Sequence, residues 1–133
     1  MKTFVNILLI LFVSSLFSCT KTKESMKMNI ELDVFSGRPN PSWVLENEDA
    51  ENVSKMLQNL PISPKKNPIG ELGYRGFIVT SNEKQSFRIY EAVVFKETEP
   101  KEIFLDENNV EQLLIKMANE KGYGGILESL GVK

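Results

Sequence analysis

The sequence predicts a single α+β domain, in which an antiparallel sheet of about four strands carries two helices on one face. Three observations lead to this fold class. A strand-like segment comes first, a helical segment follows it, and three strand-like segments then succeed one another before a last helical segment. The predicted order is β-α-β-β-β-α, and strands that follow one another through short turns are typical of an antiparallel sheet.

The first strand is expected over residues 29–35, where apolar and polar side chains alternate. Ile30, Leu32 and Val34 would face the core, because alternate side chains of a strand point to the same side. Glu31 and Asp33 would then lie on the other face. We expect that face to be solvated, because acidic side chains are seldom buried.

The first helix is expected over residues 46–60, after a short extended piece at residues 43–45. Asn47 is a suitable N-cap, and the acidic residues behind it suit the positive end of the helix dipole. Pro61 ends the helix, and two further prolines predict an irregular loop up to residue 68.

Three strands are expected in the second half of the chain, at residues 74–80, 85–95 and 101–105. They are rich in aromatic and β-branched residues, and residues 81–84 form a suitable hairpin turn between the first two. Glu91 lies between Ile89 and Val93 in this pattern. We therefore expect an inward carboxylate that needs a cationic partner.

The second helix is expected over residues 107–121, with Asp106 as its cap and Gly122 as its stop. Its apolar stripe is helical in period. The tail, residues 123–133, retains apolar side chains at Ile126 and Leu127. The tail is expected to pack back on the domain. A short third helix is one conformation it could adopt there.

The N-terminus has the pattern of a secretory signal peptide, with Lys2 before an apolar run over residues 4–17. That run is short for a membrane span, which needs about 20 residues. Leu16-Phe17-Ser18-Cys19 resembles the lipobox of bacterial lipoproteins. The resemblance implies that residues 1–18 are removed and that Cys19, the only cysteine, carries acyl chains such as palmitate.

The resemblance to lipoproteins also implies a location. Residues 19–28 would be the lipidated cysteine and its polar tether, and residues 29–133 would form one globular domain held in the cell envelope. The expected partner is the membrane, through the lipid on Cys19. Thr20 stands where an aspartate would signal inner-membrane retention, so the outer membrane is favoured if the organism has two membranes.

Composition excludes several kinds of chemistry. There is no histidine, which is the commonest general base and a common metal ligand, and no second cysteine. No glycine-rich phosphate loop is present. The formal net charge of −2 offers no basic field for nucleic acid. We therefore expect no metal, no cofactor and no enzymatic activity.

Two motifs remain as candidates for a binding site, FSGRPNPSW at residues 35–43 and LGYRGF at residues 72–77. Each places an arginine and an aromatic residue beside glycine. An arginine on a stiff loop is well suited to grip a carboxylate or another anion. The candidate rim for an anionic or polar ligand comprises Ser36, Gly37, Arg38, Asn40, Trp43, Tyr74 and Arg75.

A structural interpretation of the same residues stays open. A strand that leaves the sheet through Gly37 to Pro41 needs its backbone groups satisfied, and Arg38 and Asn40 would do this. Arg38 would pair with Asp33, Glu46 or Glu91. Large aromatic side chains such as Trp43 are usually part of a core.

The two motifs together resemble a group of small, often secreted, uncharacterised proteins that carry an FSGRPNPxW and a GYRGF motif. The resemblance implies no activity, only that the two motifs lie together in space. The favoured function is a lipid-anchored extracytoplasmic binding or accessory protein. The alternatives are a structural or inhibitor-type envelope protein and, third, a hydrolase using Ser36 or Glu91.

Overall fold

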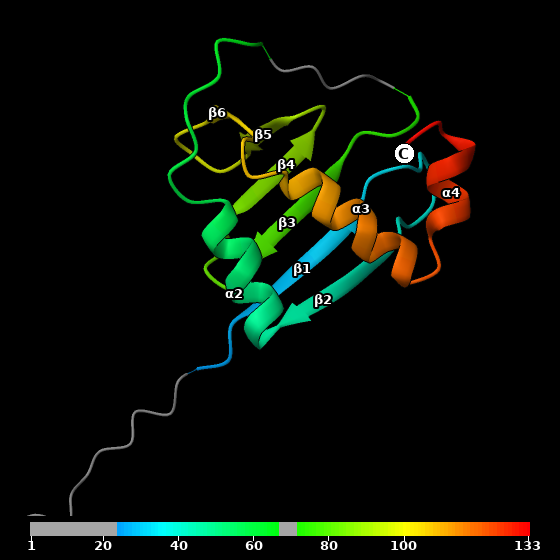
Figure 1. The fold of residues 1–133 in the computed structure, drawn as a ribbon, viewed down its shortest axis with the longest axis horizontal. Coiled ribbons are helices and arrows are strands. Elements are labelled where there is room, and N and C mark those ends of the chain that lie inside the picture. Colours follow the sequence, from blue (N-terminus) through cyan, green and yellow to red (C-terminus); the bar gives the residue numbers. More distant parts are fainter. Residues whose placement is uncertain (1–23, 67–71) are drawn as a thin grey trace, which may run out of the picture.

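The computed structural model of the chain describes residues 24–66 and 72–133. Within these two segments it contains one antiparallel sheet of six strands, with three helices (Figure 1). The α+β class and the antiparallel sheet are therefore confirmed. The expected numbers of about four strands and two helices are too low, because one predicted strand is two and the short extended piece is a full strand.

The strands lie in the order β2-β1-β3-β4-β5-β6, and every neighbouring pair is antiparallel. The strands are β1 (Lys27–Leu32), β2 (Ser42–Glu46), β3 (Phe77–Ser81), β4 (Ser86–Tyr90), β5 (Val93–Lys96) and β6 (Glu102–Leu105). β1 begins two residues before the predicted strand, within the predicted tether. It lies between β2 and β3, so the chain returns to pair with β1 after the first helix.

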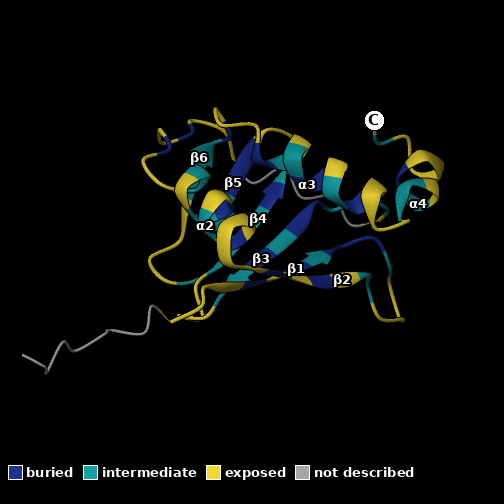
Figure 2. Cartoon of the chain, turned by 60° about the horizontal axis from the view of Figure 1, so that its bottom comes forward, coloured by how far each residue is buried: buried dark blue, intermediate teal, exposed yellow. Residues whose placement is uncertain are grey.

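The helices α2 (Asn47–Met56) and α3 (Val110–Glu120) lie on the same face of the sheet, as predicted (Figures 1 and 2). The short helix α4 (Gly124–Ser129) lies beside the end of the sheet and packs on α3. The tail therefore packs back on the domain, and it takes the form of a short third helix, which the sequence left open. No helix of the described residues is long and apolar enough to cross a membrane.

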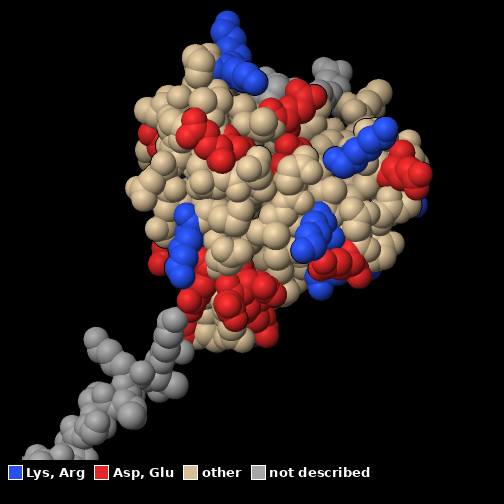
Figure 3. Space-filling view, viewed as in Figure 1, with Lys and Arg blue, Asp and Glu red and all other residues tan. Residues whose placement is uncertain are grey.

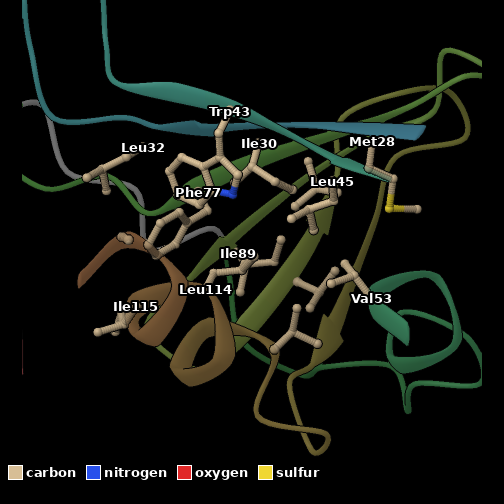
Figure 4. Packing of buried hydrophobic residues seen from close by; sticks show 14 of the residues in the cluster. Met28, Ile30, Leu32, Trp43, Leu45, Val53, Phe77, Ile89, Leu114 and Ile115 are labelled. Atoms are coloured by element: carbon tan, nitrogen blue, oxygen red, sulfur yellow. The ribbon is translucent and has the colours of Figure 1, made fainter. Parts of the chain in front are cut away.

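The core lies between the sheet and the two helices (Figure 4). Ile30, Leu32 and Val34 are buried there, as the alternation predicts. Phe77 of β3 is fully buried and contacts Trp43 edge-on, with their ring centroids 6.2 Å apart. Burying a large apolar side chain contributes about 1.5–3 kcal/mol, so this shared core is the main source of stability.

The predicted strand over residues 85–95 is instead a tight hairpin, with β4 and β5 joined at Glu91 and Ala92. Both residues have positive φ, 48° and 61°, and both are exposed. The expected inward carboxylate at Glu91 is therefore wrong. Neither residue is a usual turn former, but the backbone N–H groups of both donate to the carboxylate of Glu111 on α3. A tertiary contact thus stabilises this turn.

The helix caps differ from one another. The carboxylate of Asp106 accepts hydrogen bonds from Val110 N at 2.8 Å and Glu111 N at 2.9 Å, so it satisfies the first two donors of α3. The helix begins at Val110, three residues later than predicted, and the residue at its N-cap position is Asn109. Asn47 makes no side-chain cap bond to α2. Its Oδ1 instead accepts a hydrogen bond from Ser25 Oγ, 2.9 Å away, which ties the N-terminal segment to the start of the helix.

Candidate functional site

The two motifs lie against each other at one end of the sheet. Asp33 N donates to Gly76 O at 3.0 Å, and Arg75 N donates to Asp33 O at 2.9 Å. These bonds extend the β1–β3 pairing by backbone contacts beyond the ends of the two strands. The implied proximity of the motifs is therefore a feature of the structure. Gly76 permits this approach, because its φ of +86° lies in the left-handed region.

The centre of the arrangement is the carboxylate of Asp33. It accepts hydrogen bonds from Nε of Arg75 at 3.1 Å and from a terminal nitrogen of the same guanidinium, and a second guanidinium, that of Arg88, donates to it as well. The exposed fractions of the Asp33, Arg75 and Arg88 side chains are 9%, 16% and 13%. The expected solvated position of Asp33 is therefore wrong, and the side chain is the anion of a nearly buried ionic cluster.

The electrostatics of this cluster favour the charged form of Asp33. Burial by itself would raise the pKa of the carboxyl, but hydrogen bonds from Arg75 and Arg88 and their positive charges lower it below the ordinary 3.8. The bond to Asp33 likewise raises the pKa of Arg75. For Arg88, burial opposes the shift, but bonds to Asp33 and Glu97 raise its pKa. All three groups are therefore ionised at neutral pH.

Asn40 fixes the loop that leaves β1. Its Oδ1 accepts hydrogen bonds from the backbone N–H groups of Val34 at 3.0 Å and Phe35 at 2.8 Å. Its Nδ2 donates to Glu31 and Asp33 at 2.8 and 3.1 Å. The amide thus joins loop backbone and acidic cluster, as the structural interpretation expected of it.

Further bonds tie the arginines to the surrounding backbone. Arg75 donates to Phe35 O at 3.0 Å, and Arg88 donates to Arg75 O at 3.2 Å and to Glu97 at 2.8 Å. We call Asp33, Asn40, Arg75 and Arg88 the clasp, because together they join the loop over residues 33–41 to β3 and β4. Arg75 and Asn40, two residues of the predicted rim, thus bind within the chain.

The two aromatic residues of the predicted rim are also engaged inside the molecule. Trp43 is 8% exposed and stacks on Tyr123, with ring centroids 5.9 Å apart. The hydroxyl of Tyr74 donates to Glu111 at 2.7 Å. Burial, the charge of Glu111 and this hydrogen bond raise the pKa of Tyr74 far above its ordinary value. The Trp43 ring is therefore buried, and the Tyr74 ring is half-buried against Phe77 and Tyr90.

Three residues of the predicted rim remain at the surface: Ser36, Gly37 and Arg38. With Phe35 they form the loop tip, residues 35–38. The guanidinium carbon of Arg38 lies 3.5 Å from the centroid of the Phe35 ring, a cation–π contact. Within residues 24–66 and 72–133, no acidic side chain forms an ion pair with Arg38. The expected pairing of Arg38 with Asp33, Glu46 or Glu91 does not occur. Arg75 and Arg88 occupy the carboxylate of Asp33, and Glu46 pairs with Lys27.

The hydrolase alternative gains no support from this geometry. Ser36 lies on the loop tip, whereas Glu91 lies in the β4–β5 turn, and no contact joins them. Among the residues that the structure describes, no three acidic, histidine or cysteine side chains are grouped to hold a metal ion. Cys19, the predicted lipid attachment site, lies outside the described residues.

In comparisons with known proteins, no protein family, no curated protein and no solved structure matches this chain.

The pKa of Asp33 predicts how stability changes in acid. Because the folded carboxyl has a pKa below 3.8, it binds a proton less readily than in the unfolded chain, so protonation favours unfolding. Its contribution is complete above pH 3.8 and is lost as the pH falls below that value. Urea unfolding of wild type and Asp33→Asn between pH 7 and 3 measures this. The difference in their free energies of unfolding should narrow only in acid. A difference that stays constant with pH would contradict the lowered pKa of Asp33.

The Tyr74–Glu111 bond predicts a smaller effect. Tyr74→Phe keeps the ring and its packing but removes the donor to a partly buried carboxylate, which retains its two backbone donors. We expect a loss of about 1–2 kcal/mol in the free energy of unfolding. Urea unfolding at neutral pH measures this loss, and unchanged stability would show that the bond contributes nothing.

Proposed function

We propose that the protein is a lipid-anchored extracytoplasmic binding or accessory protein, and that its loop tip contacts an anionic or polar group of a ligand or envelope partner. The lipobox-like Leu16-Phe17-Ser18-Cys19 supports the anchor. Seven residues separate Cys19 from β1, and an extended segment of that length spans about 25 Å. The domain would therefore stay close to the membrane surface.

One observation carries the binding role: Arg38 is exposed on a loop whose base is fixed by nearly buried ion pairs. A guanidinium that is already positioned loses less conformational entropy when it binds a carboxylate or phosphate. The guanidinium lies against the Phe35 ring, and the Arg38 side chain is still exposed. Ser36 adds a hydroxyl at the same tip.

A second candidate function is a structural or inhibitor-type envelope protein without a ligand site. It is favoured by the internal engagement of Asn40, Trp43, Tyr74 and Arg75, four of the seven residues of the predicted rim. The two candidates differ in what Arg38 does, since every other arginine of the chain is held in the clasp.

The anchor is tested by labelling cells with radioactive palmitate. Wild type should carry the label and sediment with membranes. Cys19→Ser should lose the label, and Thr20→Ser, a matched control one position away, should keep it. A Cys19→Ser protein that still carries the label would overturn the lipoprotein assignment.

The loop tip is tested in the anchored protein by placing a photo-crosslinking amino acid at Ser36. Ile62, which is 75% exposed and lies beside β6, is the control position. We expect a discrete adduct from position 36 that Arg38→Glu abolishes, and no such adduct from position 62. An equal yield at both positions, or an adduct insensitive to Arg38→Glu, would favour the structural alternative.

A further inference from the structure

β2 is an edge strand whose outer side has no partner within the described residues. It pairs with β1 alone. Leu32 N donates to Pro41 O, and Asn47 N donates to Met26 O, so the odd-numbered residues of this stretch point their backbone groups toward β1. Because these directions alternate along an antiparallel strand, Ser42, Val44 and Glu46 direct their N–H and C=O groups outward.

The two edges of the sheet differ in whether another segment of the chain covers them. At β6, the preceding loop covers the edge: Ser63 N donates to Ile103 O, Leu105 N donates to Pro61 O, and Ile62 bridges to Phe104. At β2, no such segment is present among the described residues, and the central Val44 is 53% exposed. An uncovered edge with an apolar centre is a template for pairing with another strand.

A groove of about 640 Å³ accompanies this edge, between β2, α2 and α3. Its lining is charged differently at its two ends. Glu46 and Asp49 lie where β2 passes into α2, and Figure 3 shows acidic side chains gathered over the α2 end of this face. At the other end, the lining comprises Lys116 and Glu120 of α3, which form an ion pair at 3.9 Å, and Lys121, which follows the helix. The stacking of Tyr123 on Trp43 places this end near the start of β2.

We propose that the β2 edge pairs with β2 of a second copy of this chain, in antiparallel register centred on Val44. Val44 then faces its own equivalent, and Ser42 faces Glu46 of the other copy. The two-fold axis of such a pair is perpendicular to the sheet, so the helices of both copies lie on one face and the sheet becomes continuous. The contact is isologous, as in most homodimers.

Charge complementarity favours this occupant. An antiparallel pair brings Asp49, at the acidic end of one edge, toward Lys121 at the opposite end of the other. Glu46 and Lys116 are already paired within the chain, with Lys27 at 2.7 Å and Glu120 at 3.9 Å, so Asp49 and Lys121 carry the complementary charges. A parallel pair would bring like ends together, and like charges at an interface cost free energy. Each copy thus has both an acidic and a basic end along this edge, as a two-fold symmetric contact requires.

The pairing is tested in the full chain, in its own membrane, with Val44→Cys and a mild oxidant. Residues paired through such outward-facing groups have Cα atoms about 5.5 Å apart, which lies within the range that a disulfide spans. We expect a dimer band that disappears on reduction. Ser36→Cys, exposed on the loop tip away from the edge, is the matched control and should give little dimer. Wild type, whose only cysteine is Cys19, shows how much dimer forms through Cys19 alone.

A charge swap tests the register. In the Val44→Cys chain, Asp49→Lys should lower the dimer yield about two- to fivefold, and adding Lys121→Glu should restore it. A yield no higher than that of Ser36→Cys would overturn the proposal. A disulfide-linked product whose mass shows a different protein would also overturn it, since it would assign the edge to another partner. Failure of the swap to restore the yield would overturn the antiparallel arrangement.

Discussion

Asp33→Ala is expected to lower the free energy of unfolding by about 3–5 kcal/mol, the usual cost of removing one partner from a buried ion pair. The loss is large because the substitution leaves two guanidinium groups, those of Arg75 and Arg88, nearly buried without their shared carboxylate. Asn40 also loses an acceptor. Urea unfolding of the soluble chain from Thr20 onward measures the change.

Glu31→Ala is the matched control for this prediction. Glu31 lies two residues earlier on the same face, and its carboxylate accepts from Asn40 at 2.8 Å. Its removal leaves no buried cation unpaired, so we expect a loss of about 1 kcal/mol. Equal losses for the two variants would contradict the central position of Asp33.

Gly76→Ala is expected to lower the free energy of unfolding about as much as Asp33→Ala does, because of a steric overlap. A Cβ at this position would overlap the carbonyl oxygen of Ile89 and lie 2.8 Å from Tyr90 Cβ. Because the overlapped atom is backbone, β3 and β4 would have to separate where Arg75 reaches Asp33. Positive φ costs about 1 kcal/mol or more for a non-glycine residue, and we expect the overlap to add several times that.

Gly73→Ala separates the two effects. Gly73 has nearly the same φ, +83°, but nothing lies within 4 Å of an added Cβ. The variant should therefore lose only about 1 kcal/mol. If Gly73→Ala and Gly76→Ala unfold at the same urea concentration, the close approach of the two strands at Gly76 is not what the substitution disturbs.

The sequence predicts the elements with strong periodicity and misses those set by tertiary contacts. Alternation over residues 29–35 locates β1 and its core face, and Asp106 marks the start of α3. The turn at Glu91 and Ala92 lacks turn-forming residues, because Glu111, twenty positions later, supplies the stabilising acceptor. No local pattern reports such a contact.

The site shows the same division. Both motifs are visible in the sequence, and their proximity follows from the pairing of β1 with β3. Arg88 is absent from the predicted site, and the structure places it opposite Ile78, three residues from Arg75. Two guanidinium groups that are nearly buried close together repel each other unless a carboxylate lies between them. Alternation assigns Asp33 to the face opposite the core but does not indicate that the loop over residues 33–41 and the arginines bury that part of the face.

The clasp holds the loop and leaves Arg38 at the surface, where we propose that it contacts a partner. Urea unfolding of Arg38→Ala beside Arg75→Ala tests it most directly, because the two arginines belong to the two motifs and differ in burial. We predict that Arg38→Ala loses about 1 kcal/mol or less, the value of a surface cation–π contact, and that Arg75→Ala loses about 3 kcal/mol or more. If Arg38→Ala lowers the free energy of unfolding as much as Arg75→Ala does, Arg38 is a structural residue and the proposal that it is available to a partner is wrong.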